Sequence, residues 1–151
     1  MKEMRVQELG HLVLYVRDLE RSRRFYGELL GWREVGRFGS RAVAFSSERT
    51  HHELLLIEVG PDATPIPPEP RVGLYHFGLK VGQSDEELRE AVARLKGAGV
   101  QIDGMADHTV THSVYIRDPD GNEVELYIDV QPPLWKKDPK AIFAPTRPLH
   151  L

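Results

Sequence analysis

The chain has 151 residues, of which 40% are hydrophobic and 28% charged, and its formal net charge is −3 at pH 7. This length suits one domain or two small modules that share a core, and the negative charge argues against an electrostatic nucleic-acid binder. Cysteine is absent, which excludes disulfides, thiolate nucleophiles and cysteine-based metal sites.

Seven histidines are available, so any metal must be held by His, Asp or Glu. No apolar run approaches the roughly 20 residues needed to span a bilayer. Residues 1–5 lack the apolar segment of a signal peptide. We therefore expect a cytoplasmic protein without membrane partners.

The first half begins with a strand at residues 9–16, rich in β-branched and aromatic residues. Asp18 is a good N-cap for a single helix that runs through Leu30, and Gly31 fits the position after its end. Three further strands are predicted, at residues 32–35, 42–45 and 53–59. The first half therefore has the order β-α-β-β-β.

A proline-rich stretch follows, with five prolines between residues 60 and 71. Proline lacks the backbone N–H that helices and sheet ladders need, so this stretch is predicted to be an extended linker. Because the composition does not change after it, we expect it to join two modules of one domain.

The second half repeats the order of the first. A strand is predicted at residues 74–81, and Ser84 and Glu87 have the spacing of a capping box that begins a helix ending near Gly97. A short strand at 100–103 follows. Residues 107–127 then predict strand, tight turn and strand, with Asp-Pro-Asp-Gly-Asn at 118–122 as the turn.

The last of these strands alternates. Val124, Leu126 and Ile128 share one face, and the opposite face carries Glu123, Glu125, Tyr127 and Asp129. We expect Glu125 to have a functional role and the other three to form the rest of a solvated strand face.

The internal repeat predicts a metal site. His11 and His76 stand at matching places at the start of the two modules. Two equivalent modules usually pack about a pseudo-twofold axis, which would bring these histidines together, and Glu125 could close on the same point. Two imidazoles and one carboxylate on one side of a metal form the ligand set of non-haem Fe(II) oxygen chemistry.

These residues resemble the vicinal oxygen chelate superfamily, also called the glyoxalase/bleomycin resistance/dioxygenase fold, from the start of the chain to about Asp129. The resemblance implies an α+β fold of two βαβββ modules paired about a pseudo-twofold axis, with a sheet curved around a metal-binding cleft. It implies one domain over 1–151, with module one at 7–60, linker 61–71, module two at 72–130 and a proline-rich extension at 131–151. It also implies His11, His76 and Glu125 as metal ligands.

The chain is most similar to single-domain type I extradiol dioxygenases, the catechol 2,3-dioxygenase type. His-His-Glu-Leu at 51–54 matches the motif of the acid–base histidine, which falls on His52. Asp-His-Thr-Val at 107–110 matches the segment of a further active-site histidine, His108. Tyr115 matches the tyrosine that hydrogen-bonds substrate oxygen. His112 is left as a candidate for the pocket wall.

The resemblance implies Fe(II), with Mn, Ni, Co or Zn as other metals, and a reaction in which O2 cleaves a catechol-type ring beside its hydroxyl groups. His52 would move a proton, Tyr115 would donate a hydrogen bond to a substrate oxygen, and His108 would hold that oxygen or orient its neighbours. We expect a homo-oligomer, such as a homodimer.

Other functions use the same fold. A glyoxalase-like isomerase, an epimerase and a fosfomycin-resistance-type thiol transferase are alternatives, and the last also uses two histidines and one glutamate. A metal-free protein that binds an aromatic drug is another alternative. Glyoxalase I-type enzymes take a fourth ligand from the last strand of the first module, which here is apolar in its middle. Glu53 points to the other face of that strand and Glu58 lies near its end, so a three-ligand site is favoured.

The last twenty residues combine five prolines with apolar side chains that include Trp135, Ile142 and Phe143. This composition is too rich in proline for a long helix and too apolar for a disordered tail. We expect the segment to pack along the domain, over the pocket mouth or against a second subunit.

Overall fold

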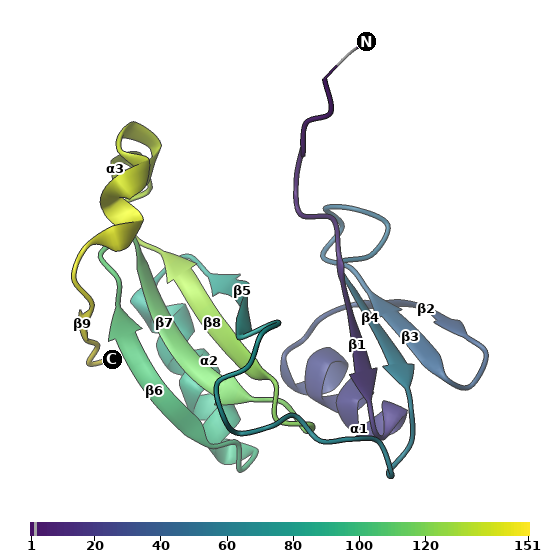
Figure 1. The fold of residues 1–151 in the computed structure, drawn as a ribbon. Helices are drawn as coiled ribbons and strands as arrows, with labels where there is room; N and C mark the ends of the chain where they lie inside the picture. The colour runs from purple at the N-terminus through teal and green to yellow at the C-terminus, as the bar shows by residue number, and fades with distance from the viewer. Residues whose placement is uncertain (2) are drawn as a thin grey trace. The chain divides into compact units, whose positions relative to one another are not determined.

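The computed structural model describes residue 1 and residues 3–151. The chain divides into two compact units, residues 1–65 and 66–151. Each unit consists of one mixed β-sheet and a helix that packs on it (Figure 1). The α+β class predicted from the sequence is therefore confirmed.

The sheet of the first unit has the strand order β1-β4-β3-β2. β1 (Leu12–Val16) pairs in parallel with β4 (Leu54–Glu58), and β4 pairs antiparallel with β3 (Ala42–Phe45). β2 (Glu34–Phe38) lies at the edge, about two residues later than predicted, since Trp32 still donates its backbone N–H to Tyr26. Alternate residues of the two central strands form the core, in which Val43, Phe45, Leu54 and Leu56 are fully buried.

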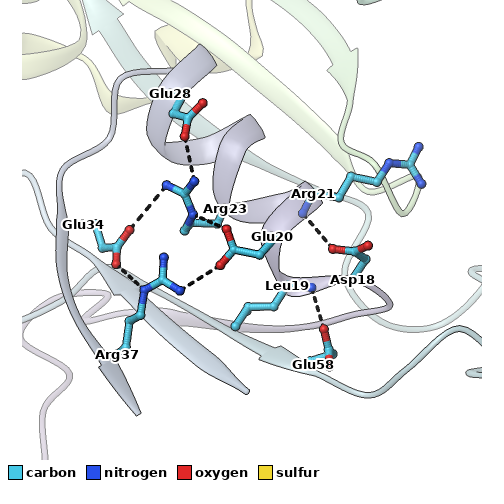
Figure 2. Close-up of polar contacts among 9 residues, drawn as sticks. All are labelled: Asp18, Leu19, Glu20, Arg21, Arg23, Glu28, Glu34, Arg37 and Glu58. Atoms are coloured by element: carbon cyan, nitrogen blue, oxygen red, sulfur yellow. Dashed lines mark hydrogen bonds and ion pairs between the residues drawn. The ribbon is translucent and has the colours of Figure 1, made fainter. Parts of the chain in front are cut away.

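Asp18 begins the helical segment as predicted, because its carboxylate accepts the backbone N–H of Arg21 at 2.8 Å. Glu58 at the end of β4 accepts the backbone N–H of Leu19 at 2.9 Å (Figure 2). Two acids therefore satisfy two N–H groups at this helix start, which would otherwise lack partners.

The sequence predicted a single uniform helix, but the structure has two helical segments of different type. α1 (Leu19–Arg23) continues as a π-helical turn, η1 (Arg24–Leu29), in which Leu30 donates to the carbonyl of Phe25. Phe25 and Tyr26 are consecutive and both buried, with ring centroids 5.0 Å apart. Gly31 ends the segment with φ of 76°, a left-handed conformation that favours glycine.

Arginines connect the outer face of this helix to β2. Arg23 binds Glu20 and Glu28, and Arg37 binds Glu20 and Glu34, each at 2.7–2.8 Å (Figure 2). The pairs lie at the protein surface, where each contributes little to stability.

The second unit repeats this arrangement with one strand added, in the order β5-β8-β7-β6-β9. β5 (His76–Gly82) pairs in parallel with β8 (Glu123–Asp129), as β1 does with β4. β7 (Thr111–Arg117) and β6 (Ile102–Asp107) continue the sheet antiparallel. The two halves of the chain thus have the same order and pairing of strands, which confirms the internal repeat predicted from the sequence.

The predicted capping box is present in the second unit. Ser84 accepts the backbone N–H of Glu87, and the Glu87 carboxylate accepts the backbone N–H of Ser84, at the start of α2 (Asp85–Gly97). The predicted turn joins β7 and β8, with Asp118 accepting from the backbone of Asp120 and Asn122. β6 extends to Asp107, four residues beyond the predicted strand end.

The C-terminal extension contains two short helices and a strand: α3 (Pro132–Lys137), the 3-10 helix η2 (Pro139–Phe143) and β9 (Arg147–Pro148). It packs back on the second unit, because β9 pairs with β6. In the part of the chain that the structure describes, no helix is long and apolar enough to cross a bilayer.

Candidate functional site

The second unit contains a cavity of ≈ 570 Å³. Four residues singled out from the sequence line it: His76 at the start of β5, Glu125 on β8, Tyr115 on β7, and His108 in the loop before β7. Its remaining walls are Val110, Thr111, Tyr127, Asp129, Trp135 and Ile142. The parallel pairing of β5 with β8 and the β7–β8 hairpin thus gather side chains that are far apart in the sequence, such as His76 and Glu125.

His76 and Glu125 are close neighbours across the parallel strands. The Nε2 atom of His76 lies 3.3 Å from Oε2 of Glu125, whose other oxygen accepts a hydrogen bond from Ser113 Oγ at 2.6 Å. Gly78 stands opposite Glu125, and a Cβ there would meet the Tyr127 ring at 3.2 Å. An imidazole nitrogen and a carboxylate oxygen are each donors suited to a divalent metal ion.

Glu123 lies behind the His76 ring. Its Oε1 is 3.4 Å from His76 Nδ1, and its Oε2 accepts from Arg117 at 2.7 Å. Glu123 is only 6% exposed, so its prediction as a solvated residue was wrong. His76 Nδ1 is itself buried and has no hydrogen bond among the described residues. A carboxylate facing Nδ1 favours a proton there, which leaves the Nε2 lone pair free for a metal.

Tyr115 and His108 form a polar pair beside these two residues. The Tyr115 hydroxyl is 2.7 Å from His108 Nε2. Burial, and then the negative charge of Glu125, raise the pKa of Tyr115 to about 12. The phenol therefore keeps its proton at neutral pH and can donate a hydrogen bond to a ligand oxygen.

The first unit carries the other predicted residues. His11 is exposed just before β1, and its ring centroid lies 4.5 Å from that of His52. Desolvation, and then the neighbouring His11 and His51, lower the pKa of His52, so its imidazole is neutral at pH 7 and can accept a proton. The exposed His51 lies 2.6 Å from His52, Nδ1 to Nδ1.

The first sheet has no carboxylate at the place that Glu125 occupies in the second. Glu125 pairs with Gly78, and the corresponding pair on β1 and β4 is Val13 with Leu55. Glu53 instead accepts the backbone N–H of Ser47, and Glu58 binds the helix start. The structure thus agrees with the apolar strand centre read from the sequence.

Each unit gathers its own set of predicted side chains, namely His11 with His52, and His76 with Glu125, Tyr115 and His108. In residues 1 and 3–151, no three His, Asp or Glu side chains are arranged to hold a metal ion. His112 does not line the cavity. It lies on the opposite side of β7, where its Nδ1 is 2.5 Å from Asp85 at the start of α2.

Several residues at the site were not assigned a role from the sequence, among them Glu123, Trp135, Ile142 and Thr146. Glu123 had a usable signal, because a tight turn at 118–122 sets Arg117 directly opposite Glu123 and so pairs opposite charges. Trp135 and Ile142 were named only as apolar residues of the extension, for which the pocket mouth was one of three expected places. Nothing in the sequence pattern connected Thr146 with His108.

A family model described as the glyoxalase/bleomycin resistance protein/dioxygenase superfamily matches residues 8–126. The catechol-2,3-dioxygenase of Bacillus subtilis is 35% identical over 130 residues, which cover 86% of this chain and 44% of that protein. The chain thus spans less than half the length of this relative. The glutathione transferase FosA of Serratia marcescens is 31% identical over 123 residues, covering 82% of each chain.

Among solved structures, a glyoxalase/dioxygenase from Nostoc punctiforme matches with a TM-score of 0.71 and 21% identity. The match covers 87% of this chain and 99% of that one. At this identity the likeness concerns the fold.

Proposed function

The chain belongs to the glyoxalase/bleomycin resistance protein/dioxygenase superfamily, and from this we propose that it is a metal-dependent dioxygenase that opens a catechol-type aromatic ring with O2. The observation that carries the proposal is the cavity of the second unit, in which His76 and Glu125 lie beside the Tyr115–His108 pair. Modules 7–60 and 72–130, with their linker and extension, would act as one functional domain.

His76 and Glu125 would hold the metal ion, and His11 would be the third ligand. The donor set fits, because the buried Nδ1 of His76 faces Glu123 while Nε2 faces Glu125. Two imidazoles and one carboxylate suit Fe(II), which we propose as the metal. When bound, Fe(II) supplies a common attachment point for the catechol oxygens and O2 and a route for electrons between them.

The remaining side chains would handle protons and orientation. His52 would accept a proton from a substrate hydroxyl, and Tyr115 would donate a hydrogen bond to a substrate oxygen and stabilise its developing charge. In the overall reaction one ring C–C bond beside the hydroxyls breaks and both atoms of O2 enter the product. One carbon becomes an aldehyde and the other a carboxylic acid, so no external reductant is needed.

The test is direct. The protein is loaded anaerobically with Fe(II), mixed with a panel of catechols and then exposed to O2. We expect O2 uptake and a yellow ring-fission product. His76→Ala should abolish both, whereas the matched variant His150→Ala, which changes an exposed histidine of the C-terminus, should retain them. Wild-type protein that contains Fe(II) but consumes no O2 with any catechol would contradict the proposal.

A thiol transferase is the second candidate, because FosA matches over 82% of its own length and the proposed ligand set does not exclude that reaction. The two functions differ in co-substrate and metal. A transferase would consume glutathione without O2 and prefer Mn, Ni, Co or Zn, whereas the dioxygenase would require O2 and prefer Fe(II).

A further inference from the structure

The C-terminal extension returns to the second unit close to the cavity. β9 pairs antiparallel with the end of β6, where Pro148 lies opposite Ala106 and Arg147 opposite Asp107. Leu149 follows, and its side chain is only 9% exposed. This pairing fixes the register of the extension along β6. It brings Thr146 next to the loop that carries His108.

Thr146 contacts the His108 imidazole directly. Its Oγ1 lies 3.0 Å from His108 Nδ1, while His108 Nε2 lies 2.7 Å from the Tyr115 hydroxyl. Both ring nitrogens therefore have a hydrogen-bonding partner, and the two partners come from segments 31 positions apart (115 to 146). With only one partner, the His108 ring could rotate by half a turn about its Cβ–Cγ bond, or its proton could move to the other nitrogen. Neither change would break a second hydrogen bond.

We propose that Thr146 is a positioning residue that fixes the orientation and tautomer of His108 toward Tyr115. The proposal rests on the proposed function, since it assigns Thr146 to the catalytic side of the same cavity. A threonine hydroxyl suits this task because it can donate its proton to Nδ1, which keeps the proton of His108 on Nε2. The Nε2–H then donates to the Tyr115 oxygen and leaves the Tyr115 proton for a substrate oxygen. Thr146 does not itself reach the cavity wall.

The chain offers a well-matched set of variants. Thr146→Val keeps the shape but loses the hydroxyl, Thr146→Ser keeps the hydroxyl, and Arg147→Ala changes the neighbouring exposed residue of β9. Thr146 is exposed, so Thr146→Val is expected to fold with an unchanged melting temperature.

The first measurement is independent of activity. In protein labelled with 15N-histidine, His108 should give the signals of a single neutral tautomer in the wild type, Thr146→Ser and Arg147→Ala. Thr146→Val should show a mixture of tautomers. Identical His108 signals in the wild type and Thr146→Val would overturn the proposal.

The second measurement is turnover of a catechol by the Fe(II)-loaded protein. Thr146→Val should lower kcat about tenfold with little change in KM, and Thr146→Ser should restore kcat. An unchanged kcat in Thr146→Val would overturn the catalytic part of the proposal. If no variant, including wild type, turns over a catechol while the tautomer still depends on Thr146, the proposed function is wrong and the positioning of His108 stands.

Discussion

Glu123 and Glu125 share one face of β8, two residues apart, and serve the same histidine in different ways. Glu125 faces His76 Nε2 in the cavity, and Glu123 faces Nδ1 from behind. Arg117 balances the charge of the buried Glu123. The proposed metal site would depend on both, because the carboxylate behind a ligating histidine orients the ring and makes it a better donor.

Replacing Glu123 with glutamine should therefore weaken metal binding. Glu123→Gln removes the charge behind His76 while preserving size, and we expect the affinity for Fe(II) to fall about tenfold. Anaerobic titration with a competing chelator measures this affinity.

Asp103→Asn provides the control, because Asp103 is the other carboxylate bound to Arg117 and makes no contact with His76. Its metal affinity should equal that of the wild type. Equal losses of affinity in both variants would mean that Arg117, and not the His76–Glu123 contact, matters.

At the scale of elements, the start of α2 depends on the Ser84 hydroxyl. Ser84→Ala removes the acceptor of the Glu87 N–H, and the loss of such a cap costs about 1 kcal/mol. We expect a lower free energy of unfolding in urea with kcat unchanged, since α2 contributes no residue to the cavity. The exposed Ser40→Ala should unfold like the wild type, and an equal loss there would exclude a capping effect.

The extension forms an apolar part of the cavity wall. Trp135 lines the cavity, whereas Phe143 in the same segment is 81% exposed and does not line it. Trp135→Ala should remove about 1 kcal/mol of binding free energy between this wall and an apolar substituent of the substrate. The KM for catechols with such a substituent should therefore rise roughly fivefold. Phe143→Ala should leave KM unchanged. Steady-state kinetics with substituted and plain catechols distinguishes the two, and a KM unaffected in Trp135→Ala would show that substrates do not reach this wall.

Most elements could be predicted from local patterns. A run of apolar residues predicted β4, alternating apolar residues predicted β8, and the capping residues Asp18 and Ser84 predicted both helix starts. The π-helical turn was missed, because it follows from burying Phe25 and Tyr26 side by side and not from helix propensity. β6 was predicted too short. Its end, Gly-Met-Ala-Asp at 104–107, has weak strand propensity and is held by pairing with β7 and β9.

The site was predictable in part for a similar reason. His76 stands at a strand start and Glu125 on an alternating strand, where the sequence pattern indicates which face a side chain takes. Thr146 and Trp135 belong to the extension, whose sequence has no periodic pattern. Its place on the second unit is fixed by the strand pairing of β9 and by the buried Leu149. Only the folded chain connects them to His108 and the cavity.

At the scale of the whole molecule, the proposed ligands come from both units. Metal that binds only the folded state should raise the melting temperature. At 100 times the dissociation constant the gain is about 2.7 kcal/mol, or roughly 5–10 °C for a chain of this size. Anaerobic calorimetry with Fe(II) should show this rise in the wild type, and His11→Ala and His76→Ala should each lose most of it. A full rise in His11→Ala would mean that the second unit binds the metal without His11.

β9 also covers part of one edge of the second sheet. A strand edge with free N–H and C=O groups can recruit a strand from another copy of the chain and so begin aggregation. β9 covers the end of β6 with only two residues, and one of them, Pro148, has no N–H to offer a further strand. β9 thus protects Ala106 and Asp107 from pairing with a strand of another copy, and removing it would free their backbone groups for such a contact.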